Sequence, residues 1–153
     1  MVAEVNYEMK ELIKLLDDNL GYISHEIQDG EINIQVRSER KEAECPYCGA
    51  ISTQIHSRTK RILKDLPIQG KKVKIHLLNH KYFCSNHKCA HKTFTERFAF
   101  FEPKATRTNR LQEEILRVSL TQSSVAASRY LRASVADVGK STICNLLKKG
   151  LEK

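Results

Sequence analysis

The 153-residue sequence contains no tryptophan, only three prolines and six glycines, and 7% aromatic residues. The low glycine and proline content excludes a collagen-like repeat, and the 41% hydrophobic content excludes an acidic disordered tail. No apolar run approaches the roughly 20 residues that a helix needs to cross a bilayer, so we expect no membrane partner. The first residues, Met1 to Asn6, have neither a basic nor an apolar segment, so we expect no secretory signal and a cytoplasmic protein.

Charge is distributed unevenly along the chain. Residues 1–44 contain 5 basic and 11 acidic side chains, a net charge of −6, whereas residues 45–153 contain 21 basic and 7 acidic ones, a net of +14. Such a density of positive charge is typical of proteins that bind a polyanion, because neutralising phosphates releases condensed counterions. A basic surface that only keeps the protein soluble fits the charge equally well.

The acidic N-terminal part has the pattern of a helix and a hairpin. Apolar side chains recur at helical spacing in residues 9–16. Alternating apolar residues on either side of an Asp-Gly pair predict a β-hairpin over residues 23–36. Residues 37–44 are expected to be a charged linker. We therefore assign residues 1–44 to an N-terminal helix/hairpin module with a docking or scaffold role.

Four of the five cysteines form two closely spaced pairs. The pairs follow the pattern C-x2-C, then 35 residues, then C-x4-C. This spacing is typical of a tetrahedral Zn(II) site at the base of a β-ribbon, and four thiolates leave no open position, so the metal would be structural. The expected ligands are Cys45, Cys48, Cys84 and Cys89. A redox dithiol, two unbonded thiol pairs, and His87 or His91 as a ligand in place of Cys89 remain alternatives.

The sequence pattern of the segment around these cysteines predicts β-strands. Residues 71–83 predict a long strand pair or a bent strand, preceded by a turn at residues 66–70. We assign residues 45–101 to a zinc-ribbon domain, which has little apolar mass and should stay disordered without metal. Cys48→Ser should accordingly unfold residues 45–98. The aromatic side chains of this segment are expected in the ribbon core rather than in base stacking: Tyr82, Phe83, Phe94 and Phe98.

The C-terminal part, residues 104–153, has helical periodicity. Helices are predicted over residues 107–120, after the Thr-Gln-Ser-Ser segment at 121–124, and after Gly139. Three short helices, the last beginning with Lys-Ser-Thr and ending in lysines, fit a helix-turn-helix, and a three-helix bundle with polar caps fits as well. The connection from residue 131 to 139 is longer than in a compact helix-turn-helix. Cys144 is expected to be a partly buried small residue.

Together these patterns predict an α+β fold with a small N-terminal helix and β-hairpin, a four-cysteine zinc β-ribbon and a C-terminal three-helix helix-turn-helix. The expected DNA-contacting residues are basic or polar side chains of the ribbon and the helices: Arg58, Lys60, Arg61, Lys81, Arg107, Arg110, Lys140, Ser141, Thr142, Asn145 and Lys148.

An ordered run of motifs resembles one group of transposases. It comprises Cys45-Pro-Tyr-Cys-Gly49, Arg61-Ile-Leu-Lys-Asp-Leu-Pro-Ile-Gln-Gly70, Lys81-Tyr-Phe-Cys84 with Cys89, and Lys92-Thr-Phe-Thr-Glu-Arg97. This run resembles the N-terminal zinc finger of the bacterial ISL-three family of insertion-sequence transposases. Thr106-Arg-Thr-Asn-Arg-Leu111 and the Lys140-Ser-Thr-Ile segment resemble that family's helix-turn-helix. The resemblance spans about Cys45 to Gly150.

The resemblance implies a function. Such transposases continue into an RNase H-like domain whose carboxylate triad holds divalent metal, and we find no comparable set of acids here. We therefore expect no enzyme activity, but the zinc-binding, DNA-binding portion of a truncated or split bacterial transposase without its DDE-type catalytic domain. Its expected partner is the double-stranded DNA of the terminal inverted repeats, with no small-molecule substrate.

Two alternatives to this reading remain open. One is a protein-interaction or inhibitor module that forms a homodimer or dimerises with full-length transposase. The other is a standalone zinc-ribbon/helix-turn-helix transcriptional regulator.

Overall fold

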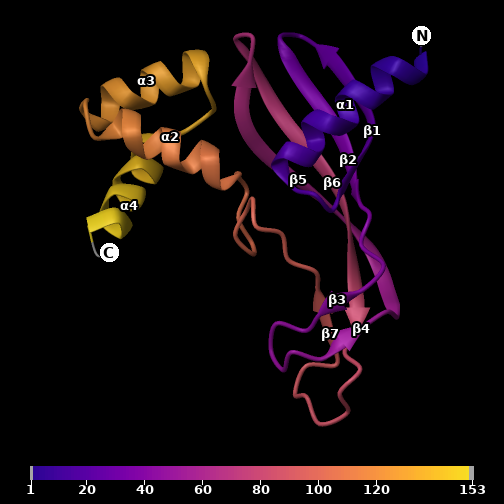
Figure 1. Ribbon diagram of the computed structural model, residues 1–153. Helices are drawn as coiled ribbons and strands as arrows, with labels where there is room; N and C mark the ends of the chain where they lie inside the picture. Colours follow the sequence, from indigo (N-terminus) through magenta and orange to yellow (C-terminus); the bar gives the residue numbers. More distant parts are fainter. Residues whose placement is uncertain (1, 152–153) are drawn as a thin grey trace.

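The computed structural model describes residues 2–151, and the side chains of residues 8–149, as a mixed α/β fold (Figure 1). The helices of this part are α1 (Val2–Leu16), α2 (Asn109–Ser119), α3 (Ser124–Ser134) and α4 (Lys140–Leu151). The strands are β1 (Leu20–Gln28), β2 (Glu31–Ser38), β3 (Ala43–Glu44), β4 (Ile51–Ser52), β5 (Ile55–Ile68), β6 (Lys71–Phe83) and β7 (Thr93–Thr95). None of the helices in residues 2–151 has the length and apolar character that crossing a bilayer requires.

The helix and the hairpin predicted at the N-terminus are present. Helix α1 begins at Val2, well before the first residue of the apolar pattern at Met9. The hairpin β1–β2 turns at Asp29 and Gly30, which both have positive φ angles of 53° and 75°. Two successive positive φ angles are characteristic of the tight turns that match the twist of a hairpin.

Strand β6 lies at the centre of the main sheet. The strand order is β1-β2-β6-β5, and β7 also pairs with β6. Strand β2 runs parallel to β6, with Ile34 opposite Ile75. This parallel pair joins residues on both sides of position 44/45, so the division between acidic and basic sequence lies within one continuous sheet.

Strands β5 and β6 form one long antiparallel hairpin (Figure 1). Residues 71–83, predicted as a strand pair or a bent strand, form the single strand β6. The turn predicted at residues 66–70 is confined to Gln69 and Gly70, with φ angles of 51° and 76°, because β5 continues to Ile68. One end of this hairpin lies in the main sheet, and the other end reaches the two short strands β3 and β4.

One face of the main sheet is buried. Alternate residues of a strand point to opposite faces, and the buried face carries Ile34, Leu63 and Ile75. Ile13 of α1 packs in this core together with three phenylalanines from the segment after β7: Phe98, Phe100 and Phe101. These aromatic rings and α1 therefore cover the same face of the sheet.

Helices α2, α3 and α4 share a second core beside the sheet (Figure 1). Leu111, Ile115, Leu131 and Ile143 are fully buried in it. Helices α2 and α3 begin at the hydroxyl caps Thr108 and Ser123, whose side chains accept hydrogen bonds from backbone N–H groups of the first turn. Cys144 is half-buried on α4, with its Sγ 3.5 Å from Ser124 Oγ, as expected for a small packing residue.

Asp65 of β5 attaches the helices to the sheet. Its carboxylate is only 3% exposed and accepts hydrogen bonds from Thr108 Oγ1 at 2.7 Å and from Arg110 Nε at 2.8 Å. The hydrogen bond to Asp65 also raises the pKa of Arg110. Because Thr108 caps α2, this one carboxylate fixes both the start of the helix and its contact with β5.

Asp65→Asn should lower the free energy of unfolding by about 2 kcal/mol, because it weakens charge-assisted hydrogen bonds at a buried site. Glu114→Gln is the matched control, since Glu114 pairs with Arg117 in the same bidentate way on the exposed surface of α2. Urea denaturation should show a clear loss for Asp65→Asn and little change for Glu114→Gln. Equal losses in the two variants would contradict the anchoring role.

Candidate metal centre

The first cysteine pair lies in the turn between β3 and β4. These strands pair through Glu44 and Ile51, and the loop between them carries Cys45 and Cys48. The N–H of Gly49 donates to the carbonyl oxygen of Cys45 at 2.8 Å, and Gly49 has a φ of 80°. A side chain at this position would strain the backbone, so glycine allows the chain to turn directly after the second thiol.

The second pair lies in the loop between β6 and β7. Cys84 directly follows β6, and its N–H donates to the carbonyl oxygen of Lys92 at 2.9 Å. Within the loop, the N–H of Cys89 donates to the Asn86 carbonyl at 3.1 Å, and Asn86 Oδ1 accepts from the N–H of Lys88 at 3.0 Å. These bonds fold the four residues between the thiols into a compact turn.

The two loops bring all four thiols together. The four Sγ atoms lie within 4.8 Å of one another, and Cys48 Sγ lies 3.5 Å from Cys84 Sγ. That separation is far longer than the roughly 2.05 Å of a disulfide. Four sulfurs bound at about 2.3 Å to one Zn(II) in a tetrahedron lie roughly 3.8 Å from one another, which matches this spacing. The donor set and its geometry therefore fit zinc.

Hydrogen bonds, burial and the neighbouring thiols shift the pKa values of the cysteines in opposite directions. A backbone hydrogen bond from Ala50 lowers the pKa of Cys48 to about 7. A backbone hydrogen bond at Asn86 acts in the same direction on Cys84, but desolvation and the neighbouring thiols outweigh it and raise its pKa to about 12. Four thiolates so close together repel one another, and a divalent cation removes that repulsion.

The histidine alternatives lie apart from this cluster. The ring of His91 stacks on Tyr47 with a centroid distance of 3.5 Å, and His87 is exposed. Within the described residues, the group that could hold a metal consists of the four thiols. A structural Zn(II) bound by cysteines is the cofactor that this arrangement supports.

The apolar support beneath the metal centre is small. Cys45, Tyr82 and Phe94 form a separate buried cluster, in which the two aromatic rings stack at 5.7 Å. Tyr82 and Phe94 are buried in the ribbon core, as predicted, whereas Phe98 is buried in the core of the main sheet and Phe83 is partly exposed. Because so few apolar side chains hold the two loops, the metal must supply much of the free energy that folds them.

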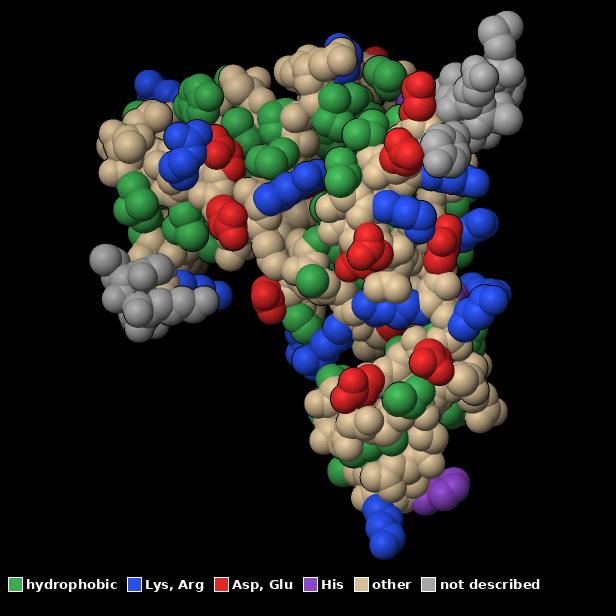
Figure 2. Space-filling model, viewed as in Figure 1, with side chains coloured by type: hydrophobic (Ala, Val, Ile, Leu, Met, Phe, Trp, Pro, Cys, Tyr) green, Lys and Arg blue, Asp and Glu red, His purple; other side chains and the backbone are tan. Residues whose placement is uncertain are grey.

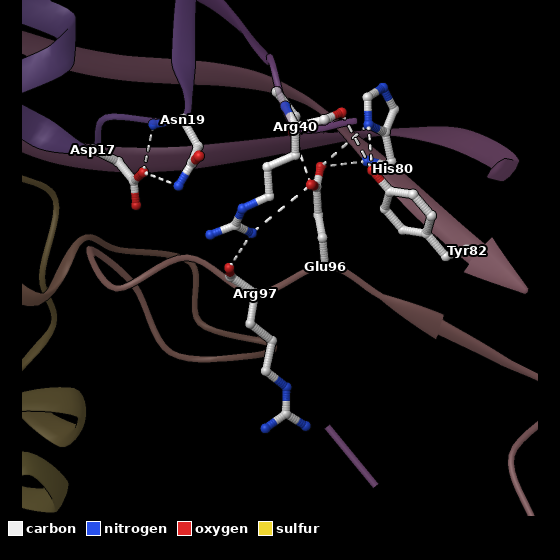
Figure 3. Close-up of polar contacts among 8 residues, drawn as sticks. Asp17, Asn19, Arg40, His80, Tyr82, Glu96 and Arg97 are labelled. Atoms are coloured by element: carbon white, nitrogen blue, oxygen red, sulfur yellow. Dashed lines mark hydrogen bonds and ion pairs between the residues drawn. The ribbon is translucent and has the colours of Figure 1, made fainter. Parts of the chain in front are cut away.

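A buried carboxylate joins this end of the ribbon to the main sheet (Figure 3). The Glu96 side chain is fully buried, and it accepts hydrogen bonds from Ser38 Oγ at 2.8 Å and from the His80 N–H at 2.7 Å. Arg40 Nη1 lies 3.8 Å from the same carboxylate. Glu96 directly follows β7 and thus connects that strand to the end of β2 and to the C-terminal part of β6.

Tyr82 completes this network. Its hydroxyl lies 3.3 Å from the Arg40 carbonyl oxygen and 3.3 Å from His80 Nδ1 (Figure 3). Burial, and then the negative charge of Glu96, raises the pKa of Tyr82, so the hydroxyl keeps its proton as a hydrogen-bond donor. The ribbon is therefore held by a polar network as well as by the metal.

The predicted DNA contacts of the ribbon lie on different faces of the sheet. Arg58 and Lys60 are exposed on the open face, opposite the buried one. Arg61 points to the buried face, where its guanidinium donates to the Ala105 carbonyl at 2.6 Å and lies 5.3 Å from the ring centroid of Phe101. Lys81 is half-buried on β6. Strand alternation thus separates residues that are close in sequence.

The predicted contacts on α4 share one side of that helix. Ile143 and Leu146 are buried, whereas the polar side chains of the set are exposed or half-buried: Lys140, Ser141, Thr142, Asn145 and Lys148. Arg110 is paired with Asp65, and Arg107 is half-buried beside α4. Direct contact of these residues with DNA remains a prediction.

Sequence reasoning missed the two buried acids, Asp65 and Glu96, and the cations Lys104 and Lys149. The acids carry a signal, since few acids occur in the basic part of the chain and each lies within a quoted motif, at 61–70 and 92–97. The lysines carry no comparable signal, because they line a groove between residues 102–107 and α4, which are segments far apart in the sequence.

Cys48→Ser should abolish the binding of one zinc ion per chain, because a serine hydroxyl is a poor substitute for a thiolate. Cys144→Ser is the matched control, since Cys144 lies on α4 and outside the cluster. Elemental analysis should find zinc in the wild type and in Cys144→Ser only. A thermal melting curve that is unchanged by a chelator would contradict a structural zinc.

Comparison with known families agrees with this geometry. Residues 41–89 match the family described as the zinc-finger of transposase IS204/IS1001/IS1096/IS1165, and the matched segment contains all four clustered thiols. No curated protein and no solved structure matches the chain. The segment 41–89 is therefore similar to the zinc finger of ISL-three transposases, and its four clustered cysteines form a structural Zn(II) site.

Proposed function

We propose that the chain is a zinc-dependent DNA-binding portion of a transposase that recognises the terminal inverted repeats of an insertion sequence. The observation that carries the proposal is the four-thiol cluster within a segment matching a transposase zinc finger. The net charge of +14 over residues 45–153 supports a polyanionic partner. In this proposal the ribbon fixes the position of the protein on the sugar–phosphate backbone.

The proposal assigns base recognition to α4. Its inner side is anchored by Ile143 and Leu146, so the polar residues Ser141 and Asn145 are held outward on a rigid helix. The five residues 135–139 that connect α3 to α4 contribute buried side chains to the same core, which fixes the relation of the two helices. A polar helix presented in this way suits the major groove, as in a helix-turn-helix.

The proposal keeps three functional parts, residues 1–44, 45–101 and 104–153. Separate apolar cores beneath the metal centre and within the three helices support a division between the last two parts. The N-terminal part shares the core of the main sheet, so its role would be to brace the β5–β6 hairpin. The proposal assigns no strand-cleaving step to the chain.

One observation favours a second function, a protein contact through α1. Leu12 and Leu15 are 59% and 83% exposed, and they lie beside Glu8 and Glu11 in a shallow hollow. Such an apolar strip on an acidic helix suits a second copy of the chain or a full-length transposase.

If α1 forms this contact in a homodimer, Leu15→Glu should convert a dimer into a monomer in light scattering, without changing zinc content. Lys10→Gln, on the same helix, is the control for a surface substitution. A wild type that is monomeric at all concentrations would contradict homodimerisation.

Band-shift titration should show tighter binding to duplexes carrying the ends of the element than to scrambled duplexes. Asn145→Ala should lower that preference about tenfold, because one base contact contributes roughly 1–3 kcal/mol of discrimination. Gln28→Ala is the matched amide control, since Gln28 is exposed on β1. Equal affinity of the wild type for both duplexes at every salt concentration would contradict sequence recognition.

A further inference from the structure

A polar groove lies between α4 and the segment that connects the ribbon to the helices. We call residues 102–107 the strap. The strap forms one wall of the groove, and Thr142, Asn145 and Lys149 of α4 form the other. These three residues recur at the i, i+3 and i+7 positions of one helix stripe. Figure 2 shows the hollow between the helices and the ribbon, with Lys and Arg atoms at its margin and acidic atoms nearby.

The strap is fixed in place by the sheet. The N–H of Lys64 donates to the carbonyl of Thr106 at 3.0 Å, and the N–H of Thr108 donates to the carbonyl of Lys64 at 2.9 Å. Arg61 adds a side-chain hydrogen bond to the carbonyl of Ala105. The strap therefore behaves as a short extension of the β5 edge, so the side chains that it carries are held in defined positions.

Lys104 occupies a backbone conformation that favours glycine. The N–H of Ala105 donates to the carbonyl of Glu102 at 3.0 Å, closing a turn in which Pro103 precedes Lys104, and Lys104 has a φ of 68°. This is the pattern of a type II β-turn, where the third position strongly prefers glycine. A lysine there costs stability, and its side chain makes no ion pair with the described residues.

Arg107 brings a second uncompensated charge to the groove. Its Nε is buried and has no hydrogen-bond partner among the described residues, and desolvation lowers its pKa. Lys149 is exposed across the groove, and the acid that lines it, Glu102, is exposed and forms no ion pair among the described residues. An unpaired, partly desolvated guanidinium is well suited to a planar, bidentate anion such as a phosphate.

The groove continues towards the metal centre. A neighbouring hollow is lined by Tyr47 of the first cysteine loop and by Arg97, and it shares Pro103 and Lys104 with the groove. Cationic side chains thus follow one path from the zinc ribbon, along the strap, to α4. An extended row of cations of this kind suits a polymer with repeating negative charges, such as a sugar–phosphate backbone, better than a single small ligand.

We propose that the strap groove seats the phosphate backbone of duplex DNA through Lys104, Arg107 and Lys149. The proposal rests on the DNA-binding function proposed above and deepens it by naming the surface that contacts the backbone. A strand seated there lies directly against α4, where Thr142 and Asn145 line the same wall. The strap then sets the position from which α4 reaches the bases.

Lys104→Gly separates this role from a structural one. Glycine relieves the positive φ, so the melting temperature should stay the same or rise, while one phosphate contact is lost. Affinity for a short mixed-sequence duplex at moderate salt should fall roughly fivefold, and the slope of log K against log[salt] should decrease by about 0.9. Lys149→Gln should decrease the slope again when the two changes are combined.

Two controls match this variant. Gln69→Gly relieves a positive φ of 51° in the β5–β6 turn without removing a charge. Lys10→Gln removes an exposed lysine from α1. Both should bind the mixed-sequence duplex like the wild type. If Lys104→Gly also binds like the wild type, the groove proposal is overturned and DNA binding stands. If the wild-type protein with zinc binds no duplex, both proposals are overturned.

Discussion

The backbone ladder between β5 and β6 is the interaction on which the rest of the structure depends. It runs from Ile55 opposite Tyr82 to Ile68 opposite Lys71, and β6 also pairs with β2 and β7. Because Cys84 directly follows β6, the hairpin delivers a metal ligand at one end, while its body lies in the main sheet. The ladder is regular from Ser57 to Asp65, with register shifts near both ends, and the zinc loops, the strap and the helices all attach to this one hairpin.

Two buried acids link neighbouring elements of the fold. In a segment with a net charge of +14, Asp65 fixes the start of α2 to β5, and Glu96 fixes the end of β2 to β6. Arg40 pairs with Glu96 and Arg110 pairs with Asp65. These two arginines are therefore not free to bind a polyanion. Lys104, Arg107 and Lys149, where the strap meets α4, form no ion pair among the described residues. Net charge alone therefore overstates how much of the basic segment can face a polyanion.

Features set by neighbouring residues could be predicted, and features set by distant ones could not. The thiol spacing predicts the knuckle at Cys45 and Cys48, and an Asp-Gly pair predicts the tight turn between β1 and β2. No local sequence pattern predicts the parallel pairing of β2 with β6, because the paired residues are about forty positions apart. Arg61 lies next to Lys60 in sequence, and the two point to opposite faces of the sheet. The face of Arg61 is covered by Phe101 and Ala105, about forty positions away, so the sequence does not show that Arg61 is turned inward.

Hydrogen exchange with and without zinc tests most directly the claim that the metal holds only the end of the hairpin. Because the cluster beneath the thiols is small, zinc removal should abolish amide protection in residues 43–54 and 83–95. Residues 58–64 and 74–78 have a larger core, shared with α1, and should keep their protection. The expectation from the sequence that residues 45–101 are disordered without metal, and that Cys48→Ser unfolds residues 45–98, is therefore limited to the two cysteine loops. Loss of protection throughout the sheet, or no change near the thiols, would contradict this account.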